Sequence, residues 1–296
     1  MVSINSIKTV IFLSALSALF MMLGSLVGGR AGLQVAFIMS LVMNGIAYFF
    51  SDKIVLSMYK AQPLDPNKYA QIYTMIQGLA KEMNLPMPKL WLVPNPMANA
   101  FATGRSPSHA SVALTSGILE ILDPQELRGV LAHEMSHVRN NDILVTTIAA
   151  TLASAIGYIA NMLRFGAYIG ANTSSDSSTG RRSNPLFLLV AAMVMPIAAT
   201  LLQLALSRSR EYLADETGAE VSADPLALAA ALGKLEQSVK RVHLNNSNPM
   251  DATTAPLFIV HPLFGGGWAN LFATHPPIAD RIARLKRMSE RMPKRS

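Results

Sequence analysis

Two histidines with a glutamate directly after the first are the residues of this chain best suited to chemistry. His133 and His137 enclose the segment His-Glu-Met-Ser-His, in which the histidines stand four positions apart. A helix turns by about 100° per residue, so side chains four positions apart project from one face. Two neutral imidazoles on one face can bind one zinc ion, and Glu134 beside them can take a proton from a zinc-bound water. The motif therefore predicts zinc-dependent hydrolysis with Glu134 as the catalytic base.

The residues before the motif predict the helix that it needs. Asp123 is a favoured N-cap residue, Pro124 suits the first helical position, and Glu126 stands where a capping box has its acid. The alternative interpretation is a pair of histidines on a solvated helix face. We favour the metal site because the helical context of the motif is present.

The composition indicates a membrane protein. Of 296 residues, 51% are hydrophobic and 15% are charged, which is unusually apolar for a soluble protein. The chain has no cysteine, so thiolate ligands are excluded and zinc must be held by His, Asp or Glu. The net charge of +7 is spread among apolar runs instead of forming an aromatic-studded patch. We therefore expect a lipid bilayer as a partner, and no nucleic acid.

An N-terminal region, residues 1–51, is expected to form a transmembrane hairpin. Its two uncharged apolar runs, residues 9–28 and 33–50, are each long enough to cross a membrane. The short connection between them is nearly uncharged, whereas Lys53 and Lys60 follow the second run. Because basic residues near the membrane favour the cytoplasmic side, both ends of the hairpin are predicted to face the cytoplasm.

A second pair of apolar runs follows the motif, at residues 143–163 and 186–206. If both runs cross the bilayer, the regions 52–142 and 207–296 lie on the same side and form two halves of one cytoplasmic catalytic domain. Three arginines between the two runs conflict with the charge rule, so buried or interfacial helices are the alternative here. These arginines are Arg164, Arg181 and Arg182.

A third metal ligand is expected directly after the last apolar run. Good helix formers continue there, and Glu211 and Asp215 share one face of the predicted helix. Glu211 would complete a site of two histidines and one glutamate with an open fourth position, while Asp215 would hold a histidine ligand by its free ring nitrogen. A charged helix with salt links between its turns is the alternative. On spacing alone, Glu216 and Glu220 are rival ligands.

The region before the motif predicts one amphipathic helix, at residues 66–83, and a small antiparallel sheet. The edge of this sheet is suited to pair with an extended substrate, and a sheet that only covers the metal-binding helix is the alternative. The expected fold class is therefore mainly α with a small antiparallel β-sheet, in a multi-pass membrane protein with a zincin-like metalloprotease domain. The residues assigned to substrate binding are Asn99, Ala100 and Phe101.

Near the C-terminus, His275 precedes two prolines and a basic helix. Its imidazole is suited to donate a hydrogen bond to an oxyanion at the metal, which makes it a second catalytic candidate beside Glu134. A lone histidine is more often structural, and that interpretation stays open.

Four segments together resemble the HtpX membrane proteases of the M48 metallopeptidase family. The resemblance covers essentially the whole chain and implies that His133, His137 and Glu211 bind zinc, in preference to Glu216 or Glu220. It also implies a domain facing the bacterial cytoplasm at the inner membrane, with misfolded or damaged membrane proteins as substrates under stress. Self-cleavage of the purified protease is a further reaction to test. The segments are His133 to His137, Glu211 to Asp215, Asn99 to Ala102 and Thr274 to Pro277.

Two other functions are weighed against this one. Related M48 enzymes process prenylated peptides, but a chamber built from more helices than four apolar runs would be expected for that task. A noncatalytic module could bind client proteins around a structural zinc ion. The base Glu134 and the open fourth coordination position argue against such a module.

Overall fold

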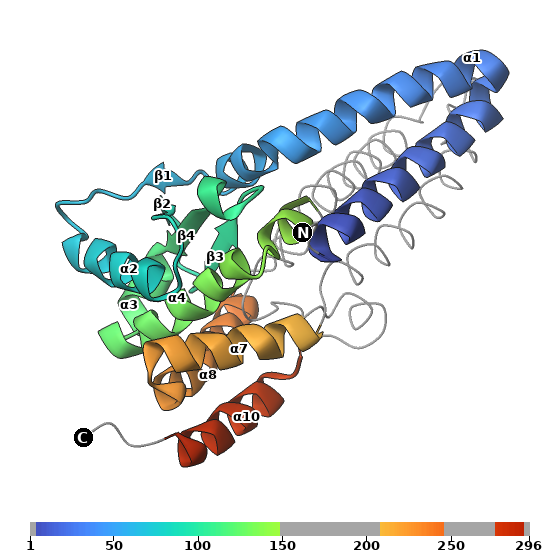
Figure 1. Cartoon of the computed structure of the whole chain (residues 1–296). Helices are drawn as coiled ribbons and strands as arrows, with labels where there is room; N and C mark the ends of the chain where they lie inside the picture. The colour runs from blue at the N-terminus through green and yellow to red at the C-terminus, as the bar shows by residue number, and fades with distance from the viewer. Residues whose placement is uncertain (1–3, 149–207, 246–275, 293–296) are drawn as a thin grey trace, which may run out of the picture.

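The computed structural model describes residues 4–148, 208–245 and 276–292 (Figure 1). Of the predicted features, the apolar run 186–206 and His275 lie outside the described residues, as does most of the run 143–163. The fold is mainly helical, as expected, and it combines a long helical hairpin with a compact group of helices and strands.

The hairpin is formed by α1, which extends over Ile4–Met58. Gly28 and Gly29 leave the helical conformation, and Gly29 has φ +55°, a left-handed value that a glycine adopts without strain. The chain therefore turns back on itself, and the two legs of α1 lie side by side (Figure 1). Across the legs, the Asn44 side-chain amide donates a hydrogen bond of 2.8 Å to the Ser17 hydroxyl.

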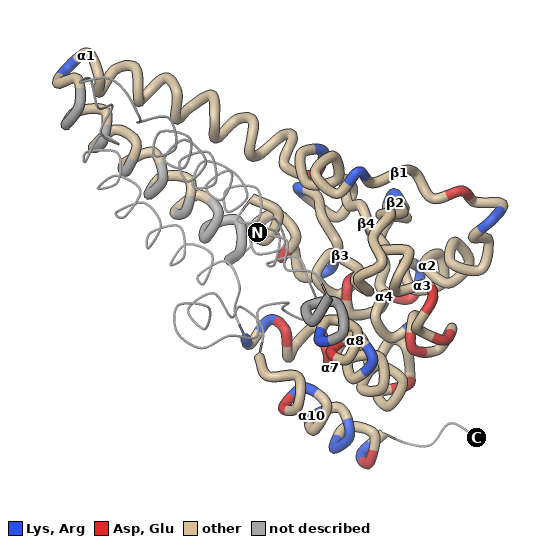
Figure 2. Tube along the Cα trace, turned by 180° about the vertical axis from the view of Figure 1, so that it is seen from behind, with Lys and Arg blue, Asp and Glu red and all other residues tan. Residues whose placement is uncertain are grey.

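The second leg, Gly28–Met58, is the one helix in the described part of the chain that is long and apolar enough to cross a membrane. Its mean hydropathy is 1.7 over the most apolar window, and large side chains such as Val35 and Ile38 are 62% and 60% exposed. Figure 2 shows this stretch as an uncharged rod with charged residues at its two ends. Exposed apolar area of this extent is typical of a surface that contacts lipid.

The strands form a four-stranded sheet in the order β1-β2-β4-β3. β2 and β4 run parallel, while β1 with β2 and β3 with β4 run antiparallel. The expectation of an antiparallel sheet is therefore wrong. β4 lies between β3 and β2 and runs antiparallel to β3. Since β3 runs opposite to β2, β4 runs in the same direction as β2. The strands are Gln62–Pro63 (β1), Lys89–Val93 (β2), Ala100–Thr103 (β3) and Ser111–Thr115 (β4).

The helix α4, Pro124–Arg139, begins as the sequence predicts. The Asp123 side chain accepts hydrogen bonds from the backbone N–H groups of residues 125 and 126, and the Glu126 carboxylate accepts one from the Asp123 N–H. This capping box satisfies N–H groups that the helix itself leaves unbonded. Lys234 also lies 2.6 Å from Glu126 and so ties the start of α4 to a later helix.

The other helices surround α4 and bury it. Its residues Val130, Leu131 and Met135 are fully buried in the main core, together with Leu228 and Leu232 of α8. Because α4 is packed on several sides, the motif that it carries is held in a closely packed part of the core. The helices are Ala70–Glu82 (α2), Ser116–Ile121 (α3), Arg208–Ser222 (α7), Pro225–Asn245 (α8) and Ile278–Arg291 (α10), with a short 3₁₀ turn at Pro107–His109.

Candidate active site

The last turns of α4 bring the two motif histidines together. Their rings are 4.9 Å apart between centroids and nearly perpendicular, as expected for residues one helical turn apart. His133 is buried, and His137 is partly exposed. Glu134 is also buried, and it lies close enough to both imidazoles for their charges to affect its ionisation.

Glu211 of α7 completes the group. Its carboxylate oxygens lie 3.7 Å from Nε2 of His133 and 3.6 Å from Nε2 of His137. One ligand atom from each of the three residues lies within 4.8 Å of the others, and no second such group occurs in the described part of the chain. The donor atoms of a tetrahedral zinc site are roughly 3.3–3.6 Å apart, so this donor set fits a zinc ion with little movement.

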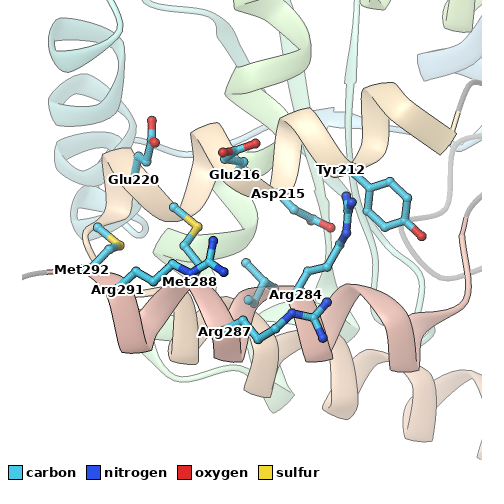
Figure 3. A pocket seen from close by; sticks show the side chains of 10 residues that line it. Tyr212, Asp215, Glu216, Glu220, Arg284, Arg287, Met288, Arg291 and Met292 are labelled. Atoms are coloured by element: carbon cyan, nitrogen blue, oxygen red, sulfur yellow. The ribbon is translucent and has the colours of Figure 1, made fainter.

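The rival carboxylates do not join this group. Glu216 and Glu220 follow Glu211 by five and nine positions, so they point from other faces of α7. Both line a pocket of about 500 Å³ between α7 and α10, opposite the arginine side chains of α10 (Figure 3). The structure therefore brings Glu211, and not Glu216 or Glu220, to the histidines.

A glycine allows α7 to approach α4 at the first histidine. A Cβ atom added to Gly218 would lie 2.8 Å from the backbone nitrogen and 2.9 Å from the Cα of His133. Real Cβ atoms do not come this close to a backbone, so any larger residue would push the two helices apart. This contact sets the distance between the helices that carry the histidines and Glu211.

Asp215 lies where its predicted role requires, with Oδ1 3.0 Å from Nδ1 of His133. Its partner on the other side is Arg281 of α10, which the sequence analysis missed. The Arg281 guanidinium donates two hydrogen bonds to this carboxylate, of 2.8 Å from Nε and 2.7 Å from Nη2. Arg281 has an exposed fraction of 0%. It shares a helix face with Leu285, four residues later, which was the one signal in the sequence that could have found it.

Asp142 is a second residue that the sequence analysis missed. It is buried just beyond the end of α4, and its Oδ2 lies 3.3 Å from Nδ1 of His137. Each motif histidine thus has one ring nitrogen directed at Glu211 and the other at an aspartate. Such partners hold a ligating imidazole in one orientation and one tautomer.

The charges of the site shift several pKa values. Burial raises the pKa of Glu134, although both histidines oppose the shift. Burial alone would lower the pKa of His137, but the hydrogen bond that its Nδ1 donates to Asp142 and the charge of Glu211 raise it to about 9. Burial would raise the pKa of Asp215, yet Arg281 and His133 lower it to about 2. Asp215 is therefore ionised at neutral pH in spite of its burial.

The edge strand β3 contacts the expected base directly. The Ala102 N–H donates a hydrogen bond of 2.9 Å to a Glu134 carboxylate oxygen. The backbone N–H of Ala102 therefore points away from β4. Backbone groups alternate along a strand, so Ala100 faces the same way. Asn99 bonds Thr115 of β4 instead, and the buried Phe101 ring packs 5.1 Å from the Tyr59 ring. Of the predicted substrate-binding residues, only Ala100 directs its backbone to the open edge.

Comparison with known proteins decides the family. The model of peptidase family M48 matches residues 66–289, which is most of the chain. The chain belongs to peptidase family M48. The predicted resemblance is therefore confirmed, and the matched residues include both histidines, Glu211 and Arg281.

Relatives within the M48 family match over nearly their whole length. A protease HtpX homolog of Syntrophobacter fumaroxidans is 51% identical over 282 residues, covering 95% of this chain and 98% of its own. One from Ralstonia pickettii is 46% identical, covering 97% of each chain.

The crystal structure of S. mikatae Ste24p has a similar fold, with a TM-score of 0.52 and 19% sequence identity. The match covers 95% of this chain and 65% of that one.

Proposed function

We propose that this M48 peptidase is a membrane-bound zinc endopeptidase that hydrolyses peptide bonds. The observation that carries the proposal is the convergence of His133, His137 and Glu211 beside the buried Glu134. These three side chains would hold the metal, which leaves one position open for water. When bound, zinc supplies Lewis acidity, which acidifies water and polarises a carbonyl group.

Glu134 is the proposed base. Its carboxylate takes a proton from the attacking water and later gives it to the leaving amine. Because burial raises the pKa of Glu134, the protonated form is less costly than for an exposed carboxylate. The hydrogen bond from the Ala102 N–H holds the carboxylate in place beside the histidines.

Asp215 and Arg281 are proposed to orient the first histidine. The Asp215 carboxylate would accept a hydrogen bond from His133 Nδ1–H, 3.0 Å away, so that the lone pair on Nε2 is free to bind the metal. Arg281 keeps Asp215 ionised and fixed by two hydrogen bonds. His275 stays the proposed hydrogen-bond donor to the developing oxyanion.

The substrate is proposed to bind as an extended strand along the free edge of β3. Ala100 directs its backbone groups to that edge, and two residues later the same edge contacts Glu134 through a backbone N–H group. Pairing through backbone atoms is tolerant of sequence, which suits an enzyme that degrades many misfolded or damaged membrane proteins. We place the domain on the cytoplasmic side of the bacterial inner membrane, with residues 52–142 and 207–296 as its two halves.

The first experiment replaces Glu134 by Gln in the full-length protein purified in detergent. Cleavage of casein should fall by at least about a thousandfold, because the amide of glutamine cannot take the proton, while zinc content stays near one per chain. Addition of a chelator to the parent protein should stop both casein cleavage and self-cleavage, and zinc should restore them. Casein cleavage at the parental rate by the Gln variant would overturn the role of Glu134, and a zinc-loaded parent that cleaves nothing would favour a client-binding module.

A further inference from the structure

A pocket of about 550 Å³ lies where the second leg of α1 meets the sheet. Its wall is built by the end of that leg, by the start of β2, and by the turn between β3 and β4. It is far in the sequence from the metal ligands, and no residue of the proposed active site lines it. The side chains that matter below are Phe49, Phe50, Lys53, Lys89 and Arg105.

The pocket carries an excess of positive charge. Lys53, Lys89 and Arg105 line it, and Asp52 is the one acidic residue among its lining residues. None of the three cations has a carboxylate within 4.0 Å in the described ranges of the chain. In Figure 2 the basic residues gather at this end of the hairpin, whereas the rod above it is uncharged. Unpaired cations that surround a hollow are typical of an anion-binding site.

Aromatic rings hold two of these cations at the pocket. The Lys53 ammonium lies 5.4 Å from the centre of the Phe50 ring, and the Arg105 guanidinium lies 5.6 Å from the centre of the Phe49 ring. Contacts of this kind orient a cation without neutralising it. Phe49 is 54% exposed and Phe50 is 49% exposed, so the pocket has an apolar rim as well as a charged wall.

The position of the pocket along the hairpin matches the headgroup region of a bilayer. The uncharged helical stretch between Arg30 and Asp52 is about 30 Å long at the helical rise per residue. This length equals the hydrocarbon thickness of a typical bilayer. Phe49 and Phe50 then lie at the membrane interface, and Lys53 lies just beyond it.

We propose that this pocket binds the headgroup of an anionic glycerophospholipid. The phosphate lies among Lys53, Lys89 and Arg105, and the acyl chains run along Phe49 and Phe50 onto the apolar leg. A free phosphate ester would contact the same cations, but it has no acyl chains to contact the rings. Dependence of binding on the two rings therefore distinguishes a lipid from a free phosphate ester. The proposal requires the hairpin to be in a membrane, but it does not require the protein to cleave peptides.

The test measures lipid binding to the full-length chain by native mass spectrometry from detergent. Glu134→Gln is the background, which prevents self-cleavage. Dioleoyl phosphatidylglycerol should bind to one site per chain at least tenfold more tightly than dioleoyl phosphatidylcholine. The triple variant Lys53→Gln, Lys89→Gln, Arg105→Gln should lose about a hundredfold in affinity for phosphatidylglycerol, since each cation near an anionic headgroup is worth about fivefold.

A matched control removes the same charge elsewhere on the domain. Lys60→Gln, Lys68→Gln, Lys81→Gln changes three exposed lysines outside the pocket, and its affinity for phosphatidylglycerol should stay within about twofold of the parent. Equal losses in both triple variants, or no loss in the first, would overturn the site. Equal zinc content in all variants shows that they are folded.

The aromatic rim distinguishes lipid from free phosphate. Phe49→Ala, Phe50→Ala should weaken phosphatidylglycerol binding by at least about tenfold, because two large apolar contacts with the acyl chains are lost. Glycerol phosphate binding should weaken much less, since the variant keeps all three cations and loses only the rings that orient two of them. If glycerol phosphate binds the parent as tightly as phosphatidylglycerol does, the assignment to a lipid is wrong.

Discussion

Arg281 brings a fully buried positive charge to a site that already holds four buried carboxylates, those of Glu134, Asp142, Glu211 and Asp215. Glu134, Glu211 and Asp215 would repel one another in the absence of metal, and burial makes the repulsion stronger. The guanidinium bonds Asp215 directly and lies 3.9 Å from a Glu211 oxygen. The site is therefore held together by an internal cation before any metal binds.

The role of Arg281 can be tested by Arg281→Gln. The change leaves Asp215 without its charge partner, and the pKa of Asp215 rises, so His133 is oriented less well. We expect zinc affinity to fall by about 10- to 100-fold and stability to fall by about 3–5 kcal/mol. Zinc affinity is measured by chelator competition, and unfolding is measured by heating the metal-free protein.

Two further variants separate positioning from general stability. Arg281→Lys keeps the charge without the two-pronged hydrogen bond, and it should restore part of the zinc affinity. Arg287→Gln changes an exposed arginine of the same helix and should leave both quantities unchanged. A purely structural role of Arg281 is indicated if stability falls while zinc affinity stays at the parental value.

The third proposed ligand has a natural control five residues along its own helix, on a different face. Glu211→Ala should reduce zinc content to well below 0.1 per chain, since two imidazoles alone bind zinc weakly. Glu216→Ala should leave zinc content unchanged, because this side chain lines the pocket between α7 and α10. Elemental analysis of both purified variants checks the prediction, and near-normal zinc in the Glu211 variant would redirect the search to Glu216 and Glu220.

At the scale of elements, the site depends on how closely α7 packs on α4. The histidines are on one helix and the proposed third ligand on the other, so a shift of either helix separates the ligands. At Gly218 the two helices lie so close that a Cβ atom would clash with the backbone of His133. The glycine's lack of a side chain thus serves the metal site, although Gly218 is not itself a ligand.

Gly218→Ala tests this packing. The new Cβ would meet the backbone of His133, which cannot rotate away, so α7 must move outward. We expect zinc affinity to fall at least tenfold and stability to fall by about 1–3 kcal/mol. Gly233→Ala on α8 is the control: its Cβ meets nothing within 4 Å, and the change should stabilise the helix by about 0.5–1 kcal/mol. Parental zinc affinity in the Gly218 variant would show that the contact is not limiting.

At the scale of the whole molecule, the hairpin holds its tip far from the helices of the proposed metal site (Figures 1 and 2). Arg30 lies at the tip, and the first charges beyond the other end of the second leg are Asp52 and Lys53. If this leg spans the bilayer, the tip and the domain lie on opposite sides. The positive-inside rule favours the proposed cytoplasmic position of the domain, because Lys53 and Lys60 follow this end of the leg.

Single cysteines can test this orientation, because the chain has none of its own. In intact cells whose outer membrane has been made permeable, a membrane-impermeant maleimide should label Arg30→Cys at the tip. Lys68→Cys, on the exposed surface of the domain, should react only after the inner membrane is lysed. Labelling of both cysteines from the same side would rule out a spanning second leg.

Local patterns in the sequence were enough to predict the start of α4 and the shared face of its histidines. The capping box joins residues within four positions of one another, and the two histidines are one turn apart. Such features depend on the backbone geometry of a single helix, so they can be read without knowledge of the fold. Spacing alone did not identify which acidic residue of the second helix is the third ligand. The resemblance to the M48 family favoured Glu211.

Tertiary structure alone decided the contacts between distant segments. The Arg281–Asp215 pair joins residues 66 positions apart, and the Ala102–Glu134 hydrogen bond joins residues 32 apart. The parallel pairing of β2 with β4 likewise depends on where β3 lies in the sheet. No short-range pattern encodes these contacts, because each forms only after packing of the core has set the distance between elements. The sequence by itself therefore determined which groups could do the chemistry, and the fold decided which groups orient and neutralise them.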